Sequence, residues 1–259
     1  MVTFVRAPLF VPAHKPELFA KAAASGADAV ILDLEDAVPP DAKVTARKAL
    51  RRHFTDLPVI VRINAAGIPF HAADLDAVRD LRPDAVMVPK AEDASAITTI
   101  AALTGVPVIA LIETARGVAA APAIAAAEGV TRLAFGSIDY CADLGMSHLF
   151  YALLHARSAL VFASRLAQIA APIDGVTAHF DDPGIAASDA AEAHSLGMTG
   201  KLCIHPSQVS GVLTAFLPTE VEIDWAHRVI ATGEGAAVVD GAMVDEPLRR
   251  RARAILTTP

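Results

Sequence analysis

The stretch Ala29-Val30-Ile31-Leu32-Asp33-Leu34-Glu35-Asp36 contains an apolar run that ends abruptly in two acidic residues, and a helical stretch follows it. The same sequence of apolar run, polar residue and Ala-rich helical stretch recurs along the chain. Continuous apolar strands that alternate with helices indicate parallel strands covered on both faces. The other runs are Leu9–Pro12, Val59–Val61, Ala85–Val88, Val108–Ile112, Leu133–Phe135, Ile173–Thr177 and Leu202–Ile204. The eight runs together predict a closed (β/α)8 barrel, the TIM barrel.

The chain is longer than the barrel needs. Its 259 residues predict one barrel over residues 1–215 and a C-terminal tail over residues 216–259. The tail shows a helical pattern at Val221–Glu234, an extended segment at residues 236–245 and a second helix at Pro247–Leu256. Because the barrel is already closed before it, the tail either packs beneath the barrel or reaches another subunit.

Composition excludes several classes of function. The net charge is −7, and no basic run precedes the tail, which argues against nucleic-acid binding. The one basic cluster, Arg249–Arg253, is read as a solvated helix face, with a phosphate or subunit contact as the alternative. Cys141 and Cys203 lack metal-ligand spacing and are expected to stay reduced in a cytoplasm. No apolar stretch is long enough to span a membrane.

Two acidic side chains follow neighbouring strands of the predicted barrel. Glu113 ends the fifth apolar run, and Asp139 follows the sixth. The active site of a TIM barrel lies at the carboxyl ends of its strands, so these two carboxylates are expected to converge there. Carboxylate oxygens, completed by waters and a substrate oxygen, are a usual Mg²⁺ environment. The pair therefore predicts a Mg²⁺ site, although a single acid in such a position often only caps a helix.

Four more polar residues are expected at the same mouth. Glu35 and Asp36 would either hold metal-bound waters or form ion pairs with Lys43 or Arg47, because unpaired burial of a charge is costly. Arg62 offers a planar fork for a carboxylate, unless it pairs only with those two acids. Lys90 is less specific, since a lysine at the rim of a barrel pairs with acids as often as with ligands.

Several segments of the chain resemble the citrate lyase beta-subunit family, which includes malyl-CoA and related acyl-CoA lyases. They run in order over most of the chain, and together they are specific for this family. The segments are Leu9–Ala13, Leu32–Ala37, Lys43–Arg47, Val61–Asn64, Val88–Glu92, Ile112–Gly117, Gly136–Asp139, Cys203–Gln208 and Gly241–Pro247.

The resemblance implies a Mg²⁺-dependent barrel that cleaves or forms a carbon–carbon bond between an acyl-CoA enolate and a carbonyl partner. Glu113 and Asp139 match the family's metal ligands, and Arg62 matches its arginine for the carboxylate of a 2-oxo acid. Asp245 matches an aspartate that in several members acts as acid or base in a neighbouring subunit's site. We therefore expect a cytoplasmic homo-oligomer, a trimer or a multiple of three.

The chain also departs from the family pattern. Ile138 stands where the family usually has an acidic residue before the aspartate, and the loop over residues 145–150 is short. The chain therefore holds the acyl-CoA differently, or uses another carrier or substrate size. Two alternative functions remain open at this stage. One is a metal-dependent aldolase that acts on free 2-oxo acids without CoA, and the other is a non-catalytic barrel in a lyase complex.

Overall fold

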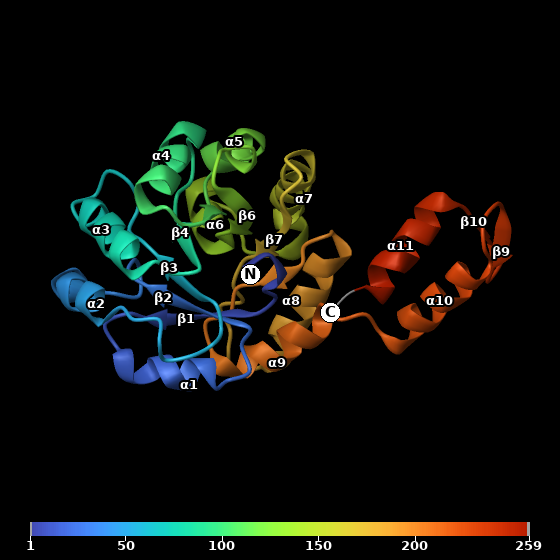
Figure 1. Cartoon of the computed structure of the whole chain (residues 1–259), viewed down its shortest axis with the longest axis horizontal. Helices are drawn as coiled ribbons and strands as arrows, with labels where there is room; N and C mark the ends of the chain where they lie inside the picture. Colours follow the sequence, from blue (N-terminus) through green and yellow to red (C-terminus); the bar gives the residue numbers. More distant parts are fainter. Residues whose placement is uncertain (1, 258–259) are drawn as a thin grey trace. The chain divides into compact units, whose positions relative to one another are not determined.

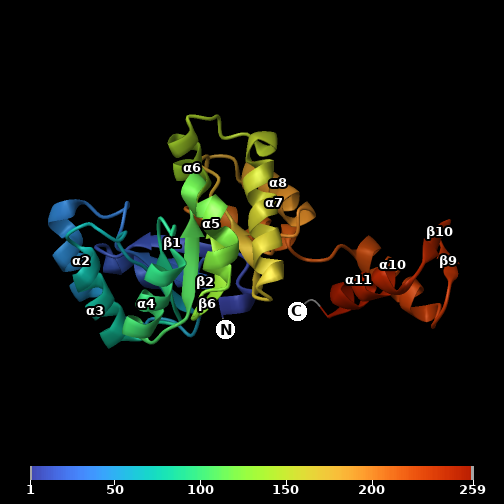
Figure 2. The same cartoon turned by 90° about the horizontal axis from the view of Figure 1, so that it is seen from above.

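The computed structural model describes residues 2–257, with the side chain of residue 3 left aside. The chain divides into two compact units, of which the first runs to Thr214 and the second begins at Ala215. Figures 1 and 2 show the first unit as a ring of strands with helices around it.

Eight parallel strands follow one another in chain order around the first unit. They are β1 (Pro8–Pro12), β2 (Ala29–Asp33), β3 (Val59–Arg62), β4 (Ala85–Val88), β5 (Val108–Ile112), β6 (Val130–Phe135), β7 (Ala170–Asp174) and β8 (Gly200–Lys201). Backbone hydrogen bonds join the last strand region to the first, since the Phe10 amide donates to the Cys203 carbonyl at 2.9 Å. This pairing closes the sheet and confirms the predicted (β/α)8 barrel.

Helices occupy the connections between the strands and cover the outside of the barrel (Figure 1). Besides the short 3-10 turn η1 (Val2–Phe4), they are η2 (Pro16–Leu18), α1 (Phe19–Ala23), η3 (Pro40–Ala42), α2 (Lys43–Ala49), α3 (His71–Leu81), α4 (Ala94–Thr104), α5 (Ala115–Ala125), α6 (Ser137–Leu144), α7 (Phe150–Leu166), α8 (Pro183–Ser195) and α9 (Pro206–Ala215).

Alternate residues of the strands, together with Val2 and Val5 before β1 and Leu202 after β8, form one buried cluster inside the barrel. This cluster consists of Val2, Val5, Ala29, Ile31, Ile60, Ala85, Met87, Ile109, Leu111, Ala134, Ile173 and Leu202. Successive side chains of a strand point to opposite faces, so Asp33, Arg62 and Glu113 continue three of these inward rows at the carboxyl ends. The apolar interior therefore ends in a polar layer at the mouth of the barrel.

The differences from the sequence prediction include two strands and one helix. Strand β7 ends at Asp174 rather than at Thr177, and β8 covers Gly200–Lys201 rather than the predicted 202–204. After β8 the chain keeps a single bridge, from Cys203 to Leu9. The apolar residues 202–204 thus follow the strand instead of forming it. Helix α6, which carries Asp139 in its first turn, was not predicted.

The second unit contains α10 (Glu220–Ala231), the antiparallel pair β9 (Ala237–Val239) and β10 (Ala242–Val244), and α11 (Glu246–Leu256). Ala226 and Val229 of α10 pack with Val244 and Ala252 in a separate small core. In α11, Arg249 donates to the Thr232 hydroxyl at 3.3 Å and Arg253 to Glu246 at 2.7 Å.

The unit thus has its own apolar core and internal polar contacts. Two of the arginines in the basic cluster make hydrogen bonds within it. Within residues 2–257, no helix combines the length and apolar character needed to cross a membrane.

Candidate active site

Arg62 and Asp33 form a bidentate ion pair at the mouth of the barrel. Arg62 Nε lies 2.7 Å from Asp33 Oδ1, and Nη2 lies 2.7 Å from Oδ2. Asp33 is fully buried. The two residues are register partners in the parallel strands β2 and β3, which places their side chains on the same face. Two nitrogens of Arg62, which were expected to bind a substrate carboxylate, therefore bind Asp33 instead.

The third nitrogen of Arg62 faces a different pair of acids. Nη1 lies 3.1 Å from Glu35 Oε2 and 3.6 Å from Asp36 Oδ2. The guanidinium also lies 4.7 Å from the centre of the Phe10 ring, a distance typical of a cation–π contact. Nη1 is thus the only nitrogen of Arg62 that is not committed to Asp33.

Lys90 lies at the centre of three carboxylates. Its Nζ atom is 3.5 Å from Glu35 Oε1, 3.6 Å from Glu113 Oε1 and 3.5 Å from Asp139 Oδ1. The backbone of Lys90 has a φ of 48°, which is uncommon for a residue other than glycine. Just after β4, this conformation turns the backbone amide towards Glu113 Oε1, to which it donates at 2.7 Å.

Glu113 is buried and fits tightly against Gly136. A Cβ atom at position 136 would lie 2.3 Å from Glu113 Cβ and 2.4 Å from Oε2. Only glycine leaves room there for the Glu113 carboxylate. Because the helix α6 begins directly after Gly136, this residue also brings Asp139 to the same side of the barrel mouth.

The buried carboxyls bind protons more tightly than usual. Burial raises the pKa of Glu113 to about 7, with Lys90 opposing the rise and Asp139 adding to it. Burial likewise raises the pKa of Glu35 to about 8, against the opposing effect of Arg62. Burial alone would lower the pKa of Lys90, but Glu113, Glu35 and Asp139 raise it above its usual range. Lys90 therefore stays positively charged near neutral pH.

A second buried network supports the β3 end of the site. Lys43 Nζ donates to the carbonyl of Glu35 at 2.8 Å and to Asn64 Oδ1 at 2.7 Å. Arg47 donates to Asp74 at 2.9 Å. Of the two alternatives for the Glu35 and Asp36 side chains, pairing with Lys43 or Arg47 is not found, because those two cations contact other groups. The acids face Arg62 instead, and Glu35 also faces Lys90.

The structure brings six of the residues singled out in the sequence together: Arg62, Lys90, Glu113, Asp139, Glu35 and Asp36. Asp245 lies in the second unit, where it caps the N-terminus of α11 and accepts from the Leu248 amide at 3.3 Å. Sequence reasoning missed Asp33, which holds Arg62. The strand register pairs the two residues, and the signal that the sequence offered was an acidic residue inside the apolar run Ala29–Leu34.

The fold and site define a class: a TIM barrel whose mouth gathers carboxylates around two cations, Arg62 and Lys90. A family model described as HpcH/HpaI aldolase/citrate lyase matches residues 6–206. This chain belongs to that family.

Similar proteins cover nearly the whole chain. A citrate lyase subunit beta-like protein of Mycobacterium tuberculosis is 39% identical over 96% of this chain and 93% of its own length. A (3S)-malyl-CoA thioesterase of Cereibacter sphaeroides is 33% identical over 93% of this chain and 89% of its own. The crystal structure of CitE from Mycobacterium tuberculosis with magnesium, acetoacetate and coenzyme A has a TM-score of 0.88 at 37% identity, covering 100% and 99% of the two chains.

Proposed function

We propose that this chain is a Mg²⁺-dependent carbon–carbon lyase. It cleaves or forms a 3-hydroxyacyl thioester of CoA, with an acyl-CoA and a small 2-oxo acid as the other reactants. The observation that carries the proposal is the convergence of Glu113 and Asp139, whose oxygens both lie within 3.6 Å of one point, Lys90 Nζ. The similar CitE structure, which contains magnesium and coenzyme A, supports the same cofactor and substrate class.

The donor set fits magnesium. Glu113 and Asp139 offer hard carboxylate oxygens, and Mg²⁺ is usually held by one or two carboxylates together with waters and substrate oxygens. Among residues 2–257 there is no cluster of three or more His, Cys, Asp or Glu side chains arranged to hold a metal. A site with two protein carboxylates leaves coordination positions for a substrate. When bound, Mg²⁺ supplies Lewis-acid polarisation of the substrate's keto oxygen.

Two cations of the protein face the substrate region. Nη1 of Arg62 is available to a carboxylate of the oxo acid, while Asp33 fixes the guanidinium plane. The Lys90 ammonium offers a compensating charge for the thioester enolate oxygen, which is negative only around the transition state. Glu35 lies beside both cations and Asp36 beside Arg62, and both acids offer oxygens to bound waters. Asp245, contributed by a neighbouring subunit of a homo-oligomer, moves the proton.

A second reaction is favoured by one relative. The similar (3S)-malyl-CoA thioesterase suggests that the same site hydrolyses a thioester. The two reactions begin from the same thioester and differ in the bond that breaks. A lyase releases an acyl-CoA and an oxo acid, whereas a thioesterase releases free CoA and a hydroxy acid. An aldolase acting on free 2-oxo acids would use no thioester at all.

The experiment is a product screen. The full chain is incubated with Mg²⁺ and a panel of hydroxyacyl-CoA thioesters and free hydroxy-oxo acids, and products are identified by mass spectrometry. We expect an acyl-CoA and an oxo acid in equal amounts, lost on chelation of the metal. Free CoA with an intact hydroxy acid would assign thioester hydrolysis. Turnover of free hydroxy-oxo acids alone would assign the aldolase activity and contradict the proposal.

A further inference from the structure

The two proposed metal ligands are held in different ways. Glu113 accepts a hydrogen bond from the Lys90 amide at 2.7 Å and packs tightly against Gly136. Among residues 2–257, the carboxylate of Asp139 pairs with Lys90 alone, at 3.5 Å, and its side chain is 42% exposed. Asp139 lies in the first turn of α6. The place of its carboxylate therefore depends on how that turn is fixed to the barrel.

Ser137, two residues before Asp139, holds this turn against the barrel. Its side chain is buried, and its Oγ atom forms a hydrogen bond of 2.8 Å with His148 Nε2. A Cβ atom at position 175 would lie 2.1 Å from the same Oγ atom, so the hydroxyl lies against the backbone of Gly175, just after β7. His148 belongs to the short loop 145–149, which runs back from the end of α6. The Ser137 hydroxyl is thus enclosed between β7 and this loop.

Both groups that enclose the hydroxyl have rigid supports. The carbonyl of Gly175 accepts from Lys201 at 2.7 Å, and Lys201 also donates to the buried Asp174 at 2.9 Å. Arg157 of α7 donates to Asp174 at 2.8 Å. His148 lies two residues before α7 begins. The ion network that joins α7 to β7 therefore also limits the positions open to His148.

A second contact ties the other end of α6 to the segment that carries Glu113. Asp143, near the end of the helix, accepts from the Ala115 amide at 2.8 Å. Ala115 lies two residues after Glu113, just beyond β5. Helix α6 is therefore tied to the barrel near both ends, and Asp139 lies between the two contacts.

The imidazole of His148 is neutral near pH 7. Burial, followed by the charges of Lys201 and Arg157, lowers the pKa of His148, while Asp189 and Asp174 oppose the shift. A neutral imidazole adds no charge to the barrel mouth. Replacing it by another uncharged side chain therefore changes the hydrogen bond to Ser137 and leaves the charges around the metal ligands as they were.

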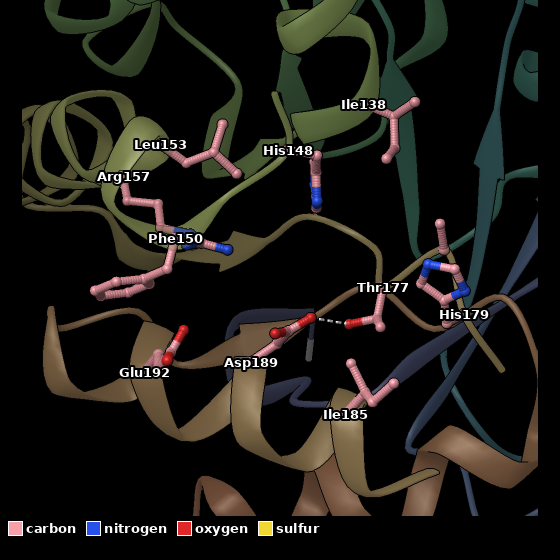
Figure 3. A pocket seen from close by; sticks show the side chains of 11 residues that line it. Ile138, His148, Phe150, Leu153, Arg157, Thr177, His179, Ile185, Asp189 and Glu192 are labelled. Carbon is pink, nitrogen blue, oxygen red and sulfur yellow. Dashed lines mark hydrogen bonds between the residues drawn. The ribbon is translucent and has the colours of Figure 1, made fainter. Parts of the chain in front are cut away.

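His148 also borders a cavity, which makes it suitable for substitution. The cavity has a volume of about 240 Å³ and lies between the barrel and helices α7 and α8. Figure 3 shows His148 pointing into it, with Thr177 and Asp189 facing it across the space. Leucine is similar in size to histidine, and swaps that conserve volume are tolerated best. A leucine at position 148 therefore tests the hydrogen bond rather than the packing.

We propose that His148 is a positioning residue for the magnesium site: through the Ser137 hydroxyl it sets the place of Asp139 relative to Glu113. The inference rests on the proposed function, because it takes these two carboxylates as the metal ligands. Mg²⁺ requires nearly octahedral oxygens at about 2.0–2.1 Å, whereas Ca²⁺ accepts variable geometry at about 2.3–2.6 Å. A less well placed Asp139 should therefore weaken Mg²⁺ binding more than Ca²⁺ binding.

Metal titrations of the full chain test this role. Dissociation constants for Mg²⁺ and Ca²⁺ are measured by calorimetry at one neutral pH. The proteins are the parent, Ser137→Ala, His148→Leu, His148→Gln and the double variant Ser137→Ala/His148→Leu. His148→Gln keeps a polar group that can reach Ser137. The matched control is His155→Leu, at an exposed position of α7 outside the cavity.

We expect His148→Leu and Ser137→Ala each to raise the Kd for Mg²⁺ about tenfold, the lower end of the range for residues that orient a metal ligand. The Kd for Ca²⁺ should rise less than about threefold. His148→Gln should recover most of the Mg²⁺ affinity, and His155→Leu should match the parent. The double variant should match the single variants within about twofold, because both changes break one hydrogen bond. If His148→Leu does not fold, Ser137→Ala, which removes a single oxygen atom, still decides the outcome.

Four results would overturn the proposal: a parental Mg²⁺ affinity in Ser137→Ala and His148→Leu, equal losses for Mg²⁺ and Ca²⁺, additive losses in the double variant, or no recovery in His148→Gln. Titration of Glu113→Gln separates this inference from the proposed function. Loss of Mg²⁺ binding in Glu113→Gln, with no change in His148→Leu, contradicts only the role of His148. Unchanged Mg²⁺ binding in Glu113→Gln contradicts the metal site itself.

Discussion

Arg62 has two separate tasks that a sequence cannot distinguish. Its Nε and Nη2 atoms hold Asp33, while Nη1 faces Glu35 and Asp36. A bidentate pair fixes the guanidinium plane, so the remaining nitrogen points in a defined direction. The guanidinium of Arg62, which the sequence suggested would bind a substrate carboxylate with two nitrogens, instead uses Nε and Nη2 to bind Asp33. Contact with the substrate therefore depends on Nη1 alone.

Replacement of Asp33 should lower the free energy of unfolding. Asp33→Asn removes the carboxylate that pairs with a guanidinium only 12% exposed, and breaking one partner of a buried pair costs about 3–5 kcal/mol. We expect a fall of that size in the free energy of unfolding, measured by urea denaturation. The control is Asp36→Asn, because Asp36 also faces Arg62 but is 62% exposed. A fall no larger in Asp33→Asn than in the control would contradict the anchoring role.

Metal affinity should depend on pH through Glu113. Burial raises the pKa of this carboxyl to about 7, so below pH 7 a proton occupies the group that the metal requires. A raised acid pKa means that binding is lost as the pH falls, and the affinity should rise between pH 6 and pH 8. Calorimetric titration of the full chain with Mg²⁺ at several pH values measures this. A constant affinity over the range would show that Glu113 carries no proton there.

At the scale of helices and strands, the pattern of apolar runs was sufficient for the barrel. Strands β4 and β5 match their predicted bounds because both are wholly buried and bounded by polar residues or turns. The pattern failed at β8, where Leu202 and Cys203 are buried but follow a two-residue strand. An apolar run in the sequence indicates that its residues are buried. A strand also requires continuous backbone hydrogen bonds to a neighbouring strand, which an apolar run does not reveal.

The carboxylate cluster was predictable for the same reason that the barrel was. Polar residues at the carboxyl ends of barrel strands meet at the mouth, and this rule identified Glu113 and Arg62. It could not identify Gly136, whose importance lies in the lack of a side chain. Nor could it show that Lys90 adopts a left-handed backbone conformation, since lysine has no preference for it. Both features depend on the three-dimensional packing around Glu113.

Gly136 offers a test of that packing. Gly136→Ala places a Cβ 2.3 Å from Glu113 Cβ, so the Glu113 side chain must move. We expect the Kd for Mg²⁺ to rise at least about tenfold and stability to fall by about 1–3 kcal/mol, a typical cost of overpacking. The double variant with Glu113→Gln should bind Mg²⁺ no more weakly than Glu113→Gln alone, because both changes act through one carboxylate. If the losses of Mg²⁺ affinity in the two single variants add up in the double variant, Gly136 does not act through Glu113.

For the whole molecule, the second unit has a small core of its own and presents Asp245 at an exposed helix N-terminus. We propose that this unit packs on a neighbouring subunit and places Asp245 at that subunit's barrel mouth, within a trimer or a multiple of three. The barrel closes without it, so the second unit has no part in completing the eight-stranded sheet.

Complementation between inactive variants tests this arrangement. Asp245→Asn should lose turnover and keep Mg²⁺ binding, while Glu113→Gln should lose the metal. Mixed under conditions that exchange subunits, the two variants should recover part of the activity, since some sites combine an intact Glu113 with an intact Asp245. The measurement is turnover of a thioester identified by the product screen. An active, strictly monomeric enzyme in sedimentation, or no recovery in verified mixed oligomers, would refute the arrangement.

The most direct test of the central claim is titration of Mg²⁺ into the parent protein and Glu113→Gln, followed by calorimetry. Glu128→Gln, an exposed position before β6, is the matched control. The parent and the control should bind one Mg²⁺ per chain with equal affinity. Glu113→Gln should bind it more than about a hundredfold more weakly, since even outer partners of a metal ligand contribute roughly 10- to 100-fold. Equal Mg²⁺ affinity in Glu113→Gln and the parent would contradict the claim that the magnesium site lies at the barrel mouth.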